Sequence, residues 1–129
     1  MIERVELPEL RPTPGYSYAV VAQGVRTVYT AGAVPLDAKG RLVGEGDLAA
    51  QADQAAGNLL ITLKAADAGT DDIAKTTVFV VASERAVLGR AWRCLEKSGL
   101  TGPPSTLLGV TFLDYEGQLI EIEAIAVLP

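Results

Sequence analysis

Two carboxylates interrupt an otherwise apolar, strand-forming run at the end of the chain. Glu121 and Glu123 stand two residues apart between Leu119 and Leu128, and strand side chains two apart point to the same face. Like charges side by side are costly to bury unless water or hydrogen bonds hold them. This part of the strand therefore either faces solvent or lines a cleft, where a carboxylate can do general acid–base work.

Three hydroxyl-bearing side chains are further candidates for a ligand site. Tyr16 begins a β-type run near the N-terminus, and both a cleft wall and ordinary packing fit its position. Ser105 and Thr106 open a later run, and their hydroxyls can donate to a bound carboxylate. Ser and Thr in strands are also common without any function, so both interpretations stay open.

A cationic stripe follows from the spacing of Arg90, Arg93 and Lys97, which fall on one side of a predicted helix. Positive charge near a helix C-terminus suits the helix dipole, so a solvated face is the simpler interpretation. The alternative is that Arg90 reaches a binding cleft. Glu123, for its part, is expected to form a structural ion pair.

Several classes of site are excluded by residues that the chain lacks. Histidine is absent and Cys94 is the single cysteine. This removes Ser–His–Asp and Cys–His catalysis, zinc sites of the usual kind and any intrachain disulfide. No Asp-rich loop has the spacing of a calcium site, so we predict no metal.

Length and charge indicate one soluble domain over residues 1–129. The chain is 49% hydrophobic and 21% charged, as in ordinary globular proteins. A net charge of −5 argues against binding to DNA through bulk charge. With no apolar run of membrane-spanning length and no signal peptide, we predict a cytoplasmic protein that binds no membrane.

The strands and helices predicted from the sequence must position these groups. Their order, β-β-α-β-α-β-β, indicates a two-layer α+β domain with a mixed sheet and two helices on one face. Asp47 is the expected N-cap and Gly69 the stop of the first helix, in which Gly57 is expected to mark a close contact. Ser83 is the expected cap of the second helix. The predicted strands are residues 16–22 and 27–31, which form a hairpin, then 76–81, 105–112 and 119–128.

A series of motifs in this order resembles the RidA/YjgF family of reactive-intermediate deaminases, also labelled endoribonuclease L-PSP. The resemblance covers nearly the whole chain. The motifs are Gly15-Tyr16, Gly32-Ala33-Val34-Pro35-Leu36, Ala65-Ala66-Asp67-Ala68-Gly69, Asp72-Ile73-Ala74-Lys75-Thr76-Thr77-Val78-Phe79-Val80 and Ile120-Glu121-Ile122-Glu123-Ala124-Ile125-Ala126-Val127.

The resemblance implies a chorismate-mutase-like fold and a homotrimer with a small-metabolite cleft between subunits. It also implies hydrolysis of enamines and imines to carbonyl compounds and ammonia, without a cofactor. Carried over by position, Glu121 is the catalytic carboxylate that positions water. Tyr16 contributes to the pocket, Thr106 stands where many members of the family have a cysteine, and Arg90 aligns with a residue of the cleft.

One position departs from the family pattern. Where the family has the arginine that clamps the substrate carboxylate, this chain has Pro104. A charged, bidentate donor is thereby replaced by a residue with no donor at all. The loss of such an interaction, about 1.5–3 kcal/mol, weakens binding of amino-acid-derived imines about ten- to hundred-fold. The resemblance therefore implies altered specificity, with Arg90 as the one substitute clamp to consider.

Two other functions compete with imine hydrolysis. A trimer that keeps the cleft but has lost turnover would be a non-catalytic ligand-binding or regulatory protein. Endoribonuclease activity is suggested only by the older family label, and an acidic chain without histidine supports it poorly.

Overall fold

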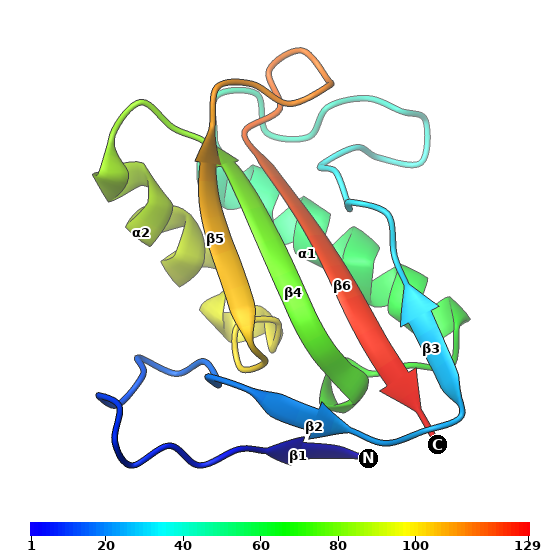
Figure 1. Cartoon of the computed structure of the whole chain (residues 1–129). Helices are drawn as coiled ribbons and strands as arrows, with labels where there is room; N and C mark the ends of the chain where they lie inside the picture. The colour runs from blue at the N-terminus through cyan, green and yellow to red at the C-terminus, as the bar shows by residue number, and fades with distance from the viewer.

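The computed structural model describes residues 1–129 and contains six strands and two α-helices (Figure 1). Two short 3-10 helices, Thr70–Asp72 and Glu96–Ser98, follow the α-helices. The elements are β1 (Ile2–Arg4), β2 (Val20–Ala22), β3 (Arg26–Tyr29), α1 (Leu48–Ala65), β4 (Ile73–Val81), α2 (Arg85–Leu95), β5 (Ser105–Val110) and β6 (Ile120–Leu128).

Four strands form the main sheet, in the order β3-β6-β4-β5. β6 runs antiparallel to both of its neighbours, whereas β4 and β5 are parallel and are connected through α2. The last two strands are therefore not neighbours, because β4 lies between them. This order places Glu121 and Glu123 in the middle of the sheet, opposite Phe79 and Thr77 of β4.

The predicted hairpin between the first two strand-forming runs is wrong. β2 pairs with β1, a segment expected to be an extended lead-in, and β3 pairs with β6. The break between β2 and β3 lies against the end of β6: a Cβ added to Gly24 would be 2.1 Å from the carbonyl oxygen of Leu128. The N–H of Val25 donates to that same oxygen at 3.0 Å. The chain thus crosses the end of β6 and divides the two strands between two sheets.

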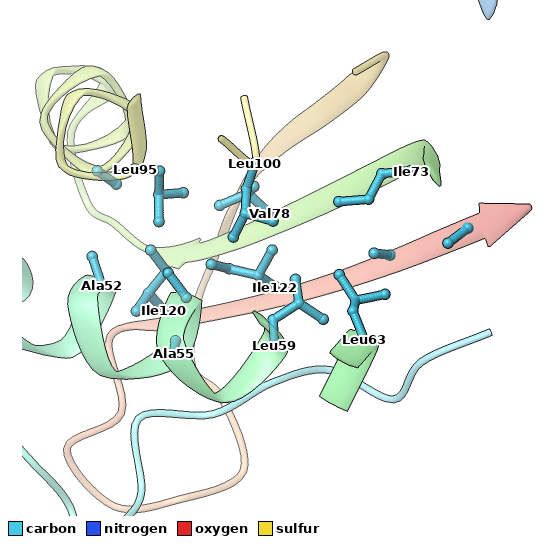
Figure 2. Close-up of a cluster of buried hydrophobic side chains, with 14 of the residues drawn as sticks. Ala52, Ala55, Leu59, Leu63, Ile73, Val78, Leu95, Leu100, Ile120 and Ile122 are labelled. Carbon is cyan, nitrogen blue, oxygen red and sulfur yellow. The ribbon is translucent and has the colours of Figure 1, made fainter. Parts of the chain in front are cut away.

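Both helices cover one face of the main sheet, as predicted, and lie behind it in Figure 1. Buried and half-buried residues alternate along the whole of β6. Ile120 and Ile122 are fully buried and belong to the same core cluster as Leu59 and Leu63 of α1 (Figure 2). Because these isoleucines face the helices, the carboxylate between them and the one that follows face the other side.

The first helix begins as predicted and ends before the predicted stop. The Asp47 side chain caps α1 by accepting a hydrogen bond of 3.1 Å from the N–H of Ala50. The helix ends before Gly69, because Asp67 adopts the left-handed conformation with φ of 63°. The N–H groups of Asp67 and the next residue donate to carbonyls of the last turn, which is a Schellman motif.

Two smaller predictions about the helices are also wrong. The N-cap of α2 is Glu84 and not Ser83, so the helix starts one residue later. A Cβ added to Gly57 would meet no heavy atom within 4 Å. This glycine therefore lies beside open space and does not mark a close contact.

The second face of the sheet carries no helix and exposes large apolar side chains. Tyr29 on β3 is 75% exposed and Leu108 on β5 is 42% exposed. We call this side the open face. Apolar surface gathered on one sheet face marks an interaction surface, because single domains usually cover it. Neither helix is long and apolar enough to cross a membrane.

Candidate functional site

Glu121 lies half-buried in the middle of β6, on the open face. Its Oε1 accepts a hydrogen bond of 3.2 Å from Nε2 of Gln118, a side chain that is only 3% exposed. Its Oε2 lies against the backbone of Gly32, where an added Cβ would be 2.3 Å away. A buried amide and a glycine thus fix the carboxylate in one position, as a general base requires.

A second buried amide holds the loop that carries Gln118. Gln51 of α1 is fully buried. Its Nε2 donates to the carbonyl oxygens of Gly44 and Gly117 at 3.0 Å each, and its Oε1 accepts from the N–H of Leu119 at 2.7 Å. One helix side chain therefore holds the residues directly before and after Gln118. Gln51 of α1 thereby positions Gln118, which in turn holds the carboxylate of Glu121.

Glu123 shares the open face but lacks the ion pair predicted for it. The two ion pairs of the structure, with N–O distances up to 4.0 Å, involve other residues. The charge of Glu123 acts at longer range on Lys75, whose Nζ donates to Oγ1 of Thr106 at 2.8 Å and to the carbonyl of Thr76 at 2.9 Å. Partial burial lowers the pKa of Lys75, and the negative charge of Glu123 opposes this shift.

Tyr16 and Ser105 line a groove at the edge of the sheet, beside β5 and α2. The groove has a volume of about 350 Å³. The Tyr16 ring meets the Trp92 ring edge to face, with centroids 6.3 Å apart and an interplanar angle of 89°. The groove is lined by Pro14, Tyr16, Gly89, Trp92, Ser105 and Leu107.

The predicted site residues fall on two sides of the sheet. Ser105 pairs with buried Thr76, and their hydroxyl oxygens are 2.8 Å apart, so Ser105 faces the helix side. Thr106 pairs with Thr77, which pairs with Glu123, so Thr106 lies on the open face. Within one chain, Tyr16 and Ser105 are brought together in the groove. Glu121 and Thr106 are separated from it by the sheet.

Arg90 joins neither group. It is exposed on α2, and the groove takes its α2 lining from Gly89 and Trp92 instead. Further along the predicted cationic stripe, Lys97 lies 3.6 Å from Asp53 of α1, and both side chains are exposed. The stripe is thus a solvated helix face within one chain.

Comparison with known proteins identifies the family. A family model described as Endoribonuclease L-PSP matches residues 7–128, which is almost the whole chain. The chain belongs to this family, the RidA/YjgF family. A RutC family protein from Synechocystis is 32% identical over 124 residues, which cover 92% of this chain and 89% of the relative.

Solved structures of RidA/YjgF proteins have the same fold. The crystal structure of YyfB, a Rid family protein of unknown function from Yersinia pestis, matches with a TM-score of 0.89 and 32% identity, over 98% of both chains. The crystal structure of the YjgF gene product from Escherichia coli matches with a TM-score of 0.64 and 31% identity, over 90% of each chain. The predicted α+β, YjgF-like fold is confirmed.

Sequence reasoning missed two residues that stand beside the RidA/YjgF candidates. Lys75 is a charge inside the apolar run of β4, a pattern as visible as that of Glu121 and Glu123. Trp92 continues the apolar side of α2, and nothing in its spacing separates it from residues that only pack. Only the approach of the N-terminal segment to α2 reveals it as a groove wall.

Proposed function

We propose that this RidA/YjgF protein hydrolyses small imines or enamines to carbonyl compounds and ammonia, without a cofactor. The observation that carries the proposal is the Glu121 carboxylate, held on the open face between Gln118 and Gly32. The carboxylate takes a proton from water as the water oxygen bonds to the imine carbon, and the C=N electron pair moves to nitrogen. The carboxyl group gives that proton to the nitrogen, which completes a carbinolamine. The carboxylate then transfers the hydroxyl proton of the carbinolamine to the amino nitrogen, the C=O bond forms as the C–N bond breaks, and ammonia leaves with the carboxylate restored.

The proposed site needs a second copy of the chain. The groove with Tyr16 and Ser105 lies on the helix side of β5, whereas Glu121 lies on the open face. Since β5 is an edge strand and the open face exposes apolar side chains, packing of one copy onto another would bring the edge groove toward a neighbouring carboxylate. The homotrimer implied by the family resemblance is the assembly we propose, and light scattering of the purified protein measures it.

The substrate specificity is proposed to differ from that of arginine-bearing relatives. Pro104 offers no donor, and its carbonyl already accepts a hydrogen bond of 3.0 Å from the N–H of Thr76. Imines with a carboxylate therefore lack a charge-assisted partner there, and we expect them to be hydrolysed poorly.

The test uses imines generated in place from amines or amino acids by a flavin oxidase, with ammonia release as the measurement. Glu121→Gln should abolish the protein-dependent rate, because an amide cannot accept the proton. Glu123→Gln is the matched control, since it makes the same change two residues away on the same face, and it should retain the rate. Equal rates for the Glu121→Gln variant and the wild type would overturn the proposal.

A second function, binding without turnover, is favoured by the same Pro104. A trimer that has lost its clamp can keep a ligand site while doing no chemistry. The two functions are separated by ligand binding in the Glu121→Gln variant. Binding with no hydrolysis of any imine by the wild type would establish the second function and exclude the first.

A further inference from the structure

Lys75 is the only positively charged side chain that the strands of the main sheet place on the open face. This face takes alternate residues of each strand, on the same side as Glu121 of β6, and Lys75 pairs with Ile125 of that side. Arg26, the other cation of the main sheet, pairs with buried Leu128 and so belongs to the helix side. An anionic group on the open face therefore has a single cationic side chain of the sheet to meet.

The ammonium group of Lys75 is held in place and still has a donor to spare. Nζ donates to Oγ1 of Thr106 at 2.8 Å and to the carbonyl oxygen of Thr76 at 2.9 Å, whereas an ammonium group carries three N–H bonds. Lys75 takes part in neither of the two ion pairs of the structure. A half-buried charge without a counter-ion is unfavourable until a partner reaches it. The third N–H is thus available to an anion on the open face.

The position of this ammonium group suits a substrate that also meets the catalytic candidate. Thr106 pairs with Thr77, which pairs with Glu123, so the three stand in one row across the open face. Glu121 lies in the next row, two residues away on β6, and such rows are about 7 Å apart. A small imine together with the attacking water spans a distance of that order. Glu121 can therefore act on the imine carbon while Lys75 binds an acidic group of the same molecule.

The same ammonium group lies near the position at which the family has its arginine. Pro104 precedes Thr106 by two residues, and alternation in an extended segment turns both toward one side of the sheet. The carbonyl of Pro104 accepts a hydrogen bond from the N–H of Thr76, so the extended pairing between β4 and β5 already includes it. Thr106, and with it Nζ of Lys75, therefore stands about 7 Å from position 104 along the chain.

We propose that Lys75, held by Thr106, binds the carboxylate of the substrate in place of the family's arginine. This inference deepens the proposed function, because it names a specificity-determining residue of the same site, and it rests on that function for the chemistry. One N–H replaces a bidentate fork, and the charge of Glu123 in the same row opposes the anion. Imines with a carboxylate thus remain poorer substrates than in arginine-bearing relatives, and their hydrolysis depends on Lys75.

The test compares two imines that differ only in the carboxylate. Flavin oxidases generate one from phenylglycine and the other, in which a hydrogen replaces the carboxylate, from benzylamine. Lys75→Met should lower kcat/KM for the phenylglycine-derived imine at least tenfold, since a charged hydrogen bond is lost, and should leave the benzylamine-derived imine unaffected. The unchanged rate on the second imine also shows that the variant is folded. An equal effect on both imines, or none on either, would overturn the inference.

Three further variants show whether the charge at this position is responsible. Lys75→Arg should keep most of the activity on the phenylglycine-derived imine, because it restores the positive charge, and Lys75→Gln should lose it as Lys75→Met does. Arg90→Met is the matched control, since it removes a positive charge from α2, and it should change neither rate. A selective loss in Arg90→Met, with none in Lys75→Gln, would assign the clamp to Arg90 and overturn the inference.

Binding of phenylglyoxylate, a stable product, separates this inference from the proposed function. In calorimetric titrations, the wild type should bind it at least tenfold more tightly than Lys75→Met does. Such binding with no hydrolysis of either imine would overturn the deaminase function and leave the role of Lys75 standing. Hydrolysis of both imines with the same preference in the wild type and in Lys75→Met would overturn the role of Lys75 alone. Dissociation of the assembly in Lys75→Met, with that preference unchanged, would assign Lys75 to a contact between copies instead.

Discussion

Gly32→Ala is the most direct test of how the fold places the catalytic candidate. A Cβ at this position would lie 2.3 Å from Oε2, 2.5 Å from Cδ and 2.6 Å from Cγ of Glu121. Since ordinary contacts of this kind are near 3.4 Å, the carboxyl group must withdraw by about 1 Å. A misplacement of that size costs about a hundredfold in rate when a reacting group is involved.

The same substitution should change stability little. The atoms that must move belong to one side chain on the open face and not to the backbone, and their displacement breaks one hydrogen bond, that from Gln118. We expect the free energy of unfolding to fall by about 1 kcal/mol or less. Gly57→Ala is the matched control, because a Cβ there meets nothing within 4 Å. It should gain up to about 1 kcal/mol from helix propensity with unchanged activity.

A double-mutant cycle then separates misplacement of the carboxylate from a general defect. In ammonia-release assays, Gly32→Ala should lower the rate in the wild-type background and change nothing in the Glu121→Gln background. A folded Gly32→Ala protein with wild-type activity would refute the reasoning. So would an equal loss in both backgrounds, because the methyl group would then act by another route.

Three further predictions concern other parts of the structure. Gln51→Leu leaves two carbonyls and one N–H without their partner, so urea unfolding should show a loss of about 2–4 kcal/mol, and a loss no larger than that of a surface substitution would contradict this. Asp67→Gly relieves a left-handed residue at the end of α1 and should gain about 0.5–1 kcal/mol in the same measurement; a loss would show that the aspartate side chain matters there. Lys75 binds its proton less tightly in the folded than in the unfolded chain, so stability should rise with pH in the interval below its usual pKa of 10.5. Lys75→Met should flatten that rise, and an identical slope in both proteins would exclude Lys75 as its source.

Local patterns predicted what depends on local geometry. The alternation in β6 placed Glu121 and Glu123 on one face, and Asp47 marked the start of α1, because both features depend on side-chain periodicity and capping. Strand pairing was another matter. The hairpin failed because Gly24 carries the chain across the end of β6, a contact between residues far apart in sequence. The predicted end of α1 was wrong because an aspartate, and not a glycine, adopts the left-handed conformation there.

The candidate site was harder to predict than the fold, because its parts come from different layers. Ser105 and Thr106 are adjacent in sequence yet face opposite sides of β5, so one joins the groove and the other joins Lys75. The family resemblance indicates which positions matter, but it does not say which of them share a face within one chain. Trp92 shows the same limit, since its place in the groove depends on where the N-terminal segment meets α2.

The location of positive charge decides what the departure at Pro104 means. Arg90 is exposed on α2 and does not line the groove, so within the chain it does not restore the missing clamp. Lys75 comes directly before Thr76, the residue of β4 that pairs with Ser105. Its Nζ, however, reaches Thr106 on the open face, on the other side of the sheet from Ser105. Lys75 is therefore the cation that shares a sheet face with Glu121 and Thr106. Because the proposed site joins the groove of one copy to the open face of another, the loss of the arginine at position 104 does not by itself remove positive charge from the site.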